Sequence, residues 1–244
     1  MAVEFSMKGY GRLLDHLNNH GYEMIRFSDL RQQSSHAARC LLRHDVDATT
    51  DFAVRMAEFE AARQVRSTYF VMLRSPLYNA LSRACTDDVR RIVELGHEVG
   101  LHFDAAYDST SSLPLATRIE RELAVLSGMT GVPVSAFSFH QPDAALLASR
   151  IVVAGGVNAY TLDSEGWQYI SDSNRDWRGR DVLDIIGRRA WLQILVHPMW
   201  WVCESGDILD CWDQAIGRNF EREQRQLLST ERAYGPPRRI EVKR

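Results

Sequence analysis

The chain has 244 residues, of which 45% are hydrophobic and 25% are charged. This composition is typical of soluble globular proteins and excludes a disordered or fibrous chain. The formal net charge of -3 gives no general attraction for nucleic acid or an anionic membrane. Because no segment approaches 18 apolar residues and the N-terminus lacks the pattern of a signal peptide, we expect one cytoplasmic domain that inserts in no membrane.

Short apolar runs alternate with helical patterns along the chain. Residues 1–35 are expected to form an N-terminal helical extension, and 207–244 a C-terminal helix and tail. The expected helices between them are 51–64, 86–95 and 115–126, the first two capped by Thr50 and Thr86. The expected strands are 40–43, 67–73, 98–101 and 191–196, with weaker patterns at 134–139 and 157–162.

This alternation predicts a mainly parallel sheet covered by helices in a single α/β domain, residues 1–244. No glycine-rich phosphate cradle follows any expected strand, so a distorted (β/α) barrel is favoured over an open, doubly wound sheet. The four cysteines are irregularly spaced and form no C-x-x-C pair, which predicts reduced thiols in the core.

Several expected strands lead directly into acidic or histidine side chains. The residues at these strand exits are Asp45, Asp47, His102, Asp104, His140 and His197. Because the carboxyl ends of parallel strands meet at one rim, residues far apart in sequence are expected to share a pocket there.

Asp45 and Asp47 lie two residues apart in an extended segment, so their side chains point the same way. Two neighbouring carboxylates repel each other unless a cation or proton lies between them, which favours a divalent metal with one Asp as ligand and the other as base. The alternative is that Asp47 only caps the following helix.

The histidines at the strand exits are candidate metal ligands or acid–base groups, although each alone could be a hydrogen-bonded core histidine. His97, at the opposite end of its strand from His102, is interpreted as structural. The polar and aromatic side chains expected to contact a sugar ring, with core packing as the alternative, are Tyr169, Asp172, Trp177, Trp200 and Trp201.

Five segments together resemble the polysaccharide deacetylase superfamily, also called carbohydrate esterase family 4 or the NodB-homology fold. They are RHDVD, GHEVGLHFD, FSFHQP, YISDSNRDWRG and LVHPMWW, which span residues 41–201. They are most similar to the subgroup associated with bacterial O-antigen and other surface-polysaccharide biosynthesis. The resemblance implies a distorted, often incomplete barrel and one divalent metal ion, with zinc favoured and cobalt or nickel as alternatives.

By position, the resemblance implies that Asp45 is the catalytic base, His197 the catalytic acid and His102 a metal ligand. The family's metal-binding Asp directly follows its base, whereas Val46 follows here, so the ligand role passes to Asp47. The family's second histidine ligand would fall at Ala106. His140 is the expected replacement, with Asp104 in reserve.

The expected activity is metal-dependent hydrolysis of an N-acyl group, in the first place N-acetyl, on a sugar or sugar nucleotide. Asp45 would take a proton from water and His197 would protonate the departing nitrogen. The alternatives are a catalytically degenerate barrel that binds carbohydrate without turnover, and a hydrolase of another amide or a phosphoester.

Overall fold

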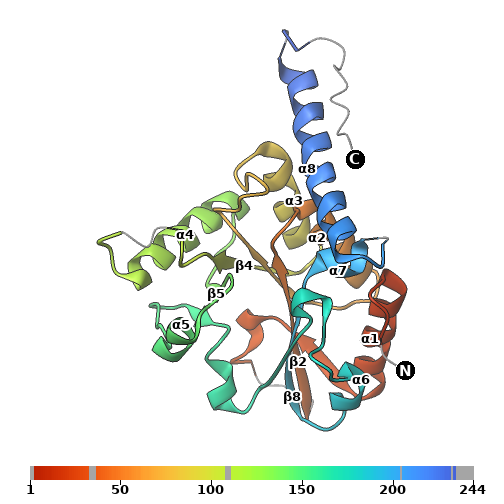
Figure 1. Ribbon diagram of the computed structural model, residues 1–244. Helices are drawn as coiled ribbons and strands as arrows, with labels where there is room; N and C mark the ends of the chain where they lie inside the picture. The colour runs from red at the N-terminus through yellow and green to blue at the C-terminus, as the bar shows by residue number, and fades with distance from the viewer. Residues whose placement is uncertain (1–2, 33–36, 108–110, 204, 232, 235–244) are drawn as a thin grey trace.

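In a computed structural model, residues 3–32, 37–107, 111–203, 205–231 and 233–234 are described (Figure 1). Their strands form one parallel sheet in the order β6-β5-β4-β3-β2-β8-β7, and β1 also pairs with β2. The predicted single-domain α/β fold with a distorted parallel barrel is confirmed. The strands are β1 (Tyr22–Ile25), β2 (Ala38–Val46), β3 (Thr68–Val71), β4 (Glu98–Phe103), β5 (Ala136–Phe139), β6 (Val157–Asn158), β7 (Gln168–Ser171) and β8 (Trp191–Val196).

Strands β1 and β7 were not predicted. The β1 strand pairs with the first half of β2, and Tyr10 from the preceding helix hydrogen-bonds to Glu60. The expected N-terminal extension, residues 1–35, therefore contains a strand of the sheet and packs as part of the domain. The pattern at 157–162 contains only the short β6, followed by a turn and a 3₁₀ helix, Leu162–Glu165.

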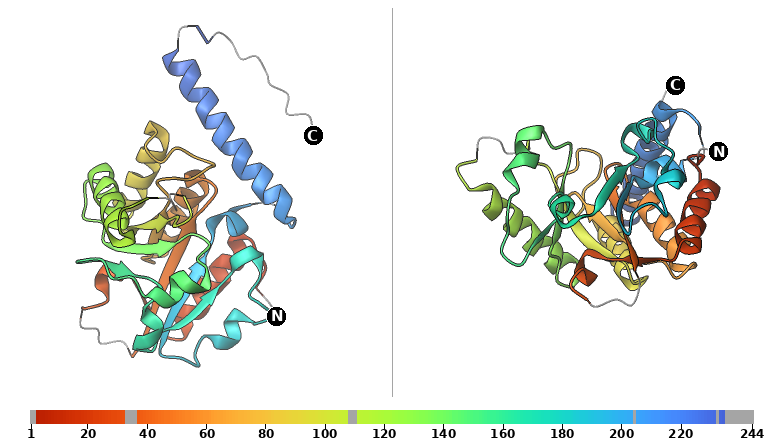
Figure 2. Two further views of the ribbon diagram at one scale, coloured as in Figure 1. Left: turned by 60° about the vertical axis from the view of Figure 1, so that its left-hand side comes forward. Right: turned by 90° about the horizontal axis from the view of Figure 1, so that it is seen from below.

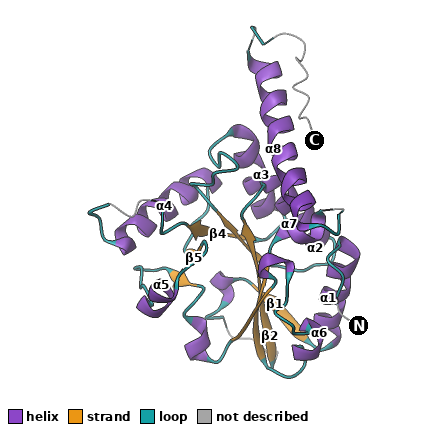
Figure 3. Ribbon diagram, viewed as in Figure 1, coloured by secondary structure: helices purple, strands orange, loops and turns teal. Residues whose placement is uncertain are grey.

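Helices cover the outside of the sheet (Figures 2 and 3). They are α1 (Met7–Asn19), α2 (Thr50–Ala61), α3 (Arg83–Glu94), α4 (Leu115–Thr130), α5 (Ala144–Ser149), α6 (Val182–Ile185), α7 (Pro198–Val202) and α8 (Ile208–Thr230). Both predicted N-caps are wrong, because Thr49 caps α2 and Ser82 caps α3. Helix α4 runs past its expected end and stops at Gly131, whose φ of 75° suits glycine.

The barrel is incomplete, since no pairing joins β6 to β7 among the described residues. Side chains occupy the opening instead: the rings of Tyr160 and Tyr169 lie 6.1 Å apart. The Arg43 guanidinium lies 4.9 Å from the Tyr160 ring centroid and 5.9 Å from that of Tyr169. Aromatic faces attract a guanidinium, so these three residues bridge the gap between the edge strands.

Strands β3 and β4 pack closely at Gly100. A Cβ on Gly100 would lie 2.6 Å from the Phe70 ring, so glycine at this position of β4 leaves room for Phe70. The Phe70 ring in turn lies 5.2 Å from the Arg43 guanidinium. Gly100 thus leaves room for the Phe70 ring, which packs against the buried Arg43 side chain of β2.

Cys203 and Cys211 form a disulfide between the end of α7 and the first turns of α8, while Cys40 and Cys85 are free and buried. The expectation that all four cysteines are reduced is therefore wrong for this pair, which the fold brings together although the spacing matches no motif. Helix α8 packs against the domain through Asn219 and Arg222, and its C-terminal end extends away from the rest of the molecule (Figures 1 and 2). No described helix is long and apolar enough to cross a membrane.

Candidate metal and catalytic site

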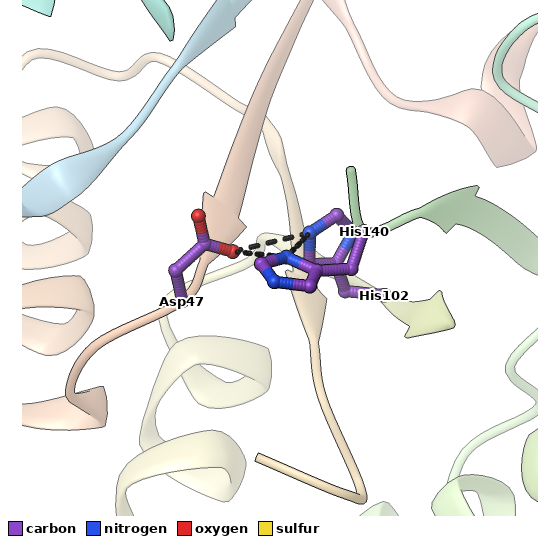
Figure 4. A group of neighbouring side chains, drawn as sticks. All are labelled: Asp47, His102 and His140. Atoms are coloured by element: carbon purple, nitrogen blue, oxygen red, sulfur yellow. Dashed lines mark hydrogen bonds and ion pairs between the residues drawn. The ribbon is translucent and has the colours of Figure 1, made fainter. Parts of the chain in front are cut away.

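Asp47, His102 and His140 converge at the carboxyl ends of β2, β4 and β5 (Figure 4). The Asp47 Oδ1 atom lies 3.1 Å from His102 Nε2 and 3.5 Å from His140 Nδ1. The two ring nitrogens lie 3.3 Å apart. Three potential ligand atoms thus form a compact triangle.

The triangle has the dimensions of a metal site. Ligand atoms around a tetrahedral zinc ion with bonds of 2.0–2.1 Å lie about 3.3 Å apart, which matches the three separations. Asp47 Oδ1 is buried and forms no well-aligned hydrogen bond within the described residues, although the two imidazole nitrogens face it at 3.1 and 3.5 Å. A cation between these atoms would give this buried oxygen and both nitrogens a common partner. The donor set therefore fits a divalent ion.

Neighbouring groups fix both imidazoles. His102 Nδ1 lies 2.8 Å from Ser138 Oγ, which leaves Nε2 facing Asp47. The backbone N–H of His140 donates to the Phe103 carbonyl oxygen at 2.8 Å, anchoring the residue at the end of β5. A hydrogen bond at the far ring nitrogen is the usual way that proteins orient a histidine ligand.

Asp104, the reserve ligand, does not belong to this group. Within the described residues, the only cluster of histidine, cysteine or acidic side chains with mutually close ligand atoms is Asp47, His102 and His140. The Asp104 carboxylate instead accepts a hydrogen bond from the Ala106 backbone N–H. Ala106 itself is exposed.

Asp45 is held by Arg43 from two residues earlier on the same face of β2. Arg43 Nη2 donates to Asp45 Oδ2 at 2.8 Å, and Nε donates to Oδ1 at 3.3 Å. Burial would raise the pKa of Asp45, but the charges of Arg43, His102 and His197 hold it below its ordinary value. Asp45 is therefore an ionised carboxylate in a fixed orientation. The sequence analysis gave Arg43 no role, although its spacing from Asp45 already implied a shared face.

His197 is oriented by Asp172. His197 Nδ1 lies 2.6 Å from Asp172 Oδ1, while Nε2 lies 3.8 Å from Asp47 Oδ2. Burial would lower the pKa of His197, but the charge and hydrogen bond of Asp172, followed by the charges of Asp47 and Asp45, raise it to about 9. At neutral pH this imidazole is protonated and directs one N–H toward the metal-ligand cluster.

The structure contradicts part of the predicted sugar-contact set. Asp172 is fully buried and also accepts a hydrogen bond from Trp201 Nε1 at 2.7 Å, so it cannot contact a sugar. Trp201 is buried as well, with its ring 4.9 Å from Phe5. Trp177 is largely buried and packs against both rings, but it also lines a smaller cavity along β7, so its predicted role stays untested. These residues looked accessible because a polar loop sequence does not reveal which side chains turn inward.

Tyr169 and Trp200 line a cavity of about 740 Å³, which also contains the metal-ligand triangle and the Asp45 and His197 side chains. Its volume falls in the range of about 300–1,000 Å³ that is typical of ligand pockets. Other lining residues include Tyr160, Arg178 and Trp212. An ionised base, a protonated acid and a three-ligand metal site thus face one space large enough for a small substrate.

His97 lies outside this cavity, as the sequence predicted. Its Nε2 atom lies 3.0 Å from the Ala57 carbonyl oxygen, and its Nδ1 atom lies 3.0 Å from Ser67 Oγ. Both nitrogens have partners within the packed core between the sheet and α2. His97 is a structural histidine.

No protein-family model and no curated protein sequence match this chain. Solved structures that resemble it include a family 4 carbohydrate esterase from Bacillus anthracis, with 14% identity over 87% of this chain and 86% of that one and a TM-score of 0.42. A chitin deacetylase from Colletotrichum lindemuthianum has 16% identity over 74% of this chain and 81% of that one, with a TM-score of 0.46.

A third similar structure is a mutant of a family 4 pseudoenzyme with restored enzymatic activity, whose wild-type form is from Bacillus anthracis. It has 17% identity over 75% of this chain, and the alignment spans 63% of the pseudoenzyme's length at a TM-score of 0.43. With identities this low and TM-scores below 0.5, these likenesses assign no activity.

Proposed function

We propose that this protein is a metal-dependent hydrolase that removes an N-acyl group, in the first place N-acetyl, from a sugar or sugar nucleotide. The triangle of Asp47, His102 and His140 beside Asp45 and His197 carries the proposal. An amide carbonyl is a poor electrophile, and its amine leaves only when protonated, so hydrolysis needs carbonyl polarisation, a base and an acid. The cavity offers a group for each task.

Asp47, His102 and His140 would hold the ion. When bound, a divalent metal supplies polarisation of the acyl oxygen and increased acidity of a water molecule. The remaining steps belong to the protein: Asp45, ionised and fixed by Arg43, accepts the proton of the attacking water. Arg43 keeps both Asp45 oxygens oriented while the charge on the carboxylate changes.

His197 serves as the acid in this scheme. The charge and hydrogen bond of Asp172 raise its pKa, which favours the protonated form, and Asp172 holds Nδ1 so that Nε2 carries the proton toward the cavity. Protonation of the departing nitrogen by Nε2 releases the free amine and acetate. The neutral ring keeps its Nδ1 proton on Asp172, and before the next turnover Nε2 takes up a proton from solvent while Asp45 gives its proton back to solvent.

The substrate class follows from the cavity lining and from the motif resemblance. Tyr160, Tyr169 and Trp200 border the cavity, and aromatic faces are suited to stacking against sugar rings. The resemblance supports a precursor of a bacterial surface glycan such as O-antigen, with zinc as the metal and cobalt or nickel as alternatives. The cytoplasmic location stays a prediction, and the Cys203–Cys211 disulfide weighs against it, since such bonds are rare in reducing compartments.

The test is acetate release from N-acetylated sugars by protein loaded in turn with zinc, cobalt or nickel. Asp45→Asn and His197→Ala should each lower turnover by about 10² to 10⁴-fold. His20→Ala, at the exposed histidine that caps the C-terminal end of α1, is the matched control and should retain full turnover. Near-normal acetate release by both Asp45→Asn and His197→Ala would show this mechanism to be wrong.

The second candidate is a carbohydrate-binding barrel without turnover. The observation in its favour is that Ala106 stands where the resemblance implies a histidine ligand. Carbohydrate binding that persists in chelator, with no acetate release under any metal, would support this alternative. Stoichiometric metal together with acetate release would eliminate it.

A further inference from the structure

We propose that a second cavity, next to the catalytic one, binds an anionic group on the acylated substrate. This cavity has a volume of about 240 Å³ and lies along the edge strand β7. It is called here the arginine cavity, because Arg178 and Arg180 are its charged lining residues and no acidic residue lines it. The inference rests on the proposed function for the identity of the acylated sugar.

The two guanidinium groups are free to bind a ligand. Within the part of the chain that the structure describes, neither Arg178 nor Arg180 makes a side-chain hydrogen bond or ion pair, and both are exposed. Arg175 in the same loop differs, because its guanidinium donates to the Phe5 and Ser205 carbonyl oxygens. The loop thus uses one arginine for its own structure and leaves two at the cavity.

Neighbouring acidic groups face away from this cavity. Asp176 accepts a hydrogen bond from the Arg178 backbone N–H, and Asp181 caps α6 by accepting from the Leu183 N–H. Neither carboxylate lines the arginine cavity, and neither forms an ion pair with Arg178 or Arg180 among the described residues. The lining of this cavity therefore carries two positive charges, although the net charge of the chain is -3.

The backbone that presents Arg178 is strained. Asn174, Arg175 and Arg178 have φ values of 59°, 57° and 55°, in the left-handed region that favours glycine. Such conformations are unfavourable for residues other than glycine and persist where the surrounding structure holds them, often at binding sites. The strain supports a role for this loop beyond connecting β7 to α6.

The two cavities adjoin each other. Tyr169 and Arg178 line both of them, so a sugar beside the metal ligands can extend a substituent past Tyr169 toward the arginines. Arginine binds phosphate and carboxylate groups through paired, charge-assisted hydrogen bonds. The ligand class is therefore an N-acylated sugar with an anionic substituent, either a phosphate, as in a sugar nucleotide, or the carboxylate of an adjacent uronic acid.

The experiment is a calorimetric binding titration with three N-acetylated probes, performed on the metal-loaded Asp45→Asn protein so that no turnover intervenes. UDP-N-acetylglucosamine carries phosphates, a hyaluronan tetrasaccharide carries carboxylates, and chitotetraose is neutral. We expect at least one anionic probe to bind more tightly than chitotetraose. Adding Arg180→Gln, at a residue that lines the arginine cavity and not the catalytic one, should lower the affinity for that probe by about 10-fold or more and leave the affinity for chitotetraose unchanged.

Arg121→Gln is the matched control, because this exposed arginine on α4 lines neither cavity and loses the same charge. Preference for the phosphate or the carboxylate probe identifies the anion, and either supports the proposal. Equal affinity for all three probes, or an equal loss of affinity for all three in Arg180→Gln, overturns it. Because binding is the readout, a failure of acetate release would refute the proposed hydrolysis without removing a difference between the probes.

Discussion

Strand β2 carries a cluster of histidine and carboxylate groups on each of its two faces. Asp45 and the nearby Asp47 face the cavity with His102, His140 and His197. His44, between Arg43 and Asp45 in sequence, points the opposite way and meets Glu60 of α2 at 2.8 Å. Both clusters contain the residue types that bind metals, and one strand positions both.

The side chains of Glu60, His44, Tyr10, Ser67 and Tyr69 form the second cluster, called here the Glu60 cluster. Both oxygens of its carboxylate have hydrogen-bonding partners. Glu60 Oε1 accepts from Tyr10 and contacts His44 Nε2, while Oε2 accepts from Ser67 at 2.6 Å and from Tyr69 at 2.8 Å. Glu60 and His44 are fully buried, and the one atom of the pair without a partner is His44 Nδ1. Because each oxygen of the Glu60 carboxylate already has two polar partners, neither is available to bind a metal ion.

The cavity cluster differs in hydrogen bonding rather than in composition. Asp47 Oδ1 is buried without a hydrogen bond, and two imidazole nitrogens face it. The comparison shows that an unsatisfied carboxylate beside open space marks a binding site, whereas a carboxylate that accepts four polar contacts marks a structural support.

Replacing His140, the third proposed metal ligand beside Asp47 and His102, should have the largest effect on the cavity cluster. His140→Ala should weaken metal binding by more than about 100-fold, since the loss of a direct ligand exceeds the 10–100-fold typical of outer contacts. Metal affinity measured by competition with a chromophoric chelator checks this. Asp104→Asn is the control and should bind like the wild type. If Asp104→Asn loses the metal while His140→Ala keeps it, the assigned ligand set is wrong.

A substitution in the Glu60 cluster should lower the stability of the protein and leave its activity unchanged. Glu60→Gln leaves His44 without its carboxylate and should lower the free energy of unfolding by about 3–5 kcal/mol. Urea denaturation measures this loss. Acetate release per folded molecule should be retained, and a variant that is as stable as the wild type but inactive would reverse the roles of the two faces.

The pH dependence of stability should also come from Glu60. Burial would raise its pKa, but His44, His97 and Ser67 lower it from 4.5 to about 2. A carboxyl whose pKa is lower in the folded protein stabilises above its unfolded pKa, so the contribution of about 3 kcal/mol should disappear as pH falls from about 4.5 to about 2. Across this range, the free energy of unfolding measured by urea denaturation should fall more steeply with decreasing pH for the wild type than for Glu60→Gln. Parallel curves would contradict the prediction.

The smallest expected effect concerns the orientation of His102. Ser138→Ala removes the partner of Nδ1 and should weaken metal binding by about 10–100-fold. Ser138→Thr retains the hydroxyl and serves as the matched variant. Unchanged affinity in Ser138→Ala would mean that packing alone orients the ring.

Local patterns predicted much of the site. Alternation along β2 placed Asp45 on the cavity face, and the strand exits predicted that His102, His140 and His197 would approach Asp47. The fold class followed from the alternation of strands and helices. Strand β7 was missed because an edge strand of four residues next to a polar loop has too little apolar pattern to stand out.

The amino-acid sequence by itself determined which side chains reach the rim, because the two-residue period of a strand and the common direction of parallel strands are local properties. Only the tertiary structure decided what each side chain does there. Asp172 became the partner of His197, Trp201 became core, and Arg43 became the support of Asp45. Burial and hydrogen-bond partners depend on segments distant in the chain, and no local pattern encodes them.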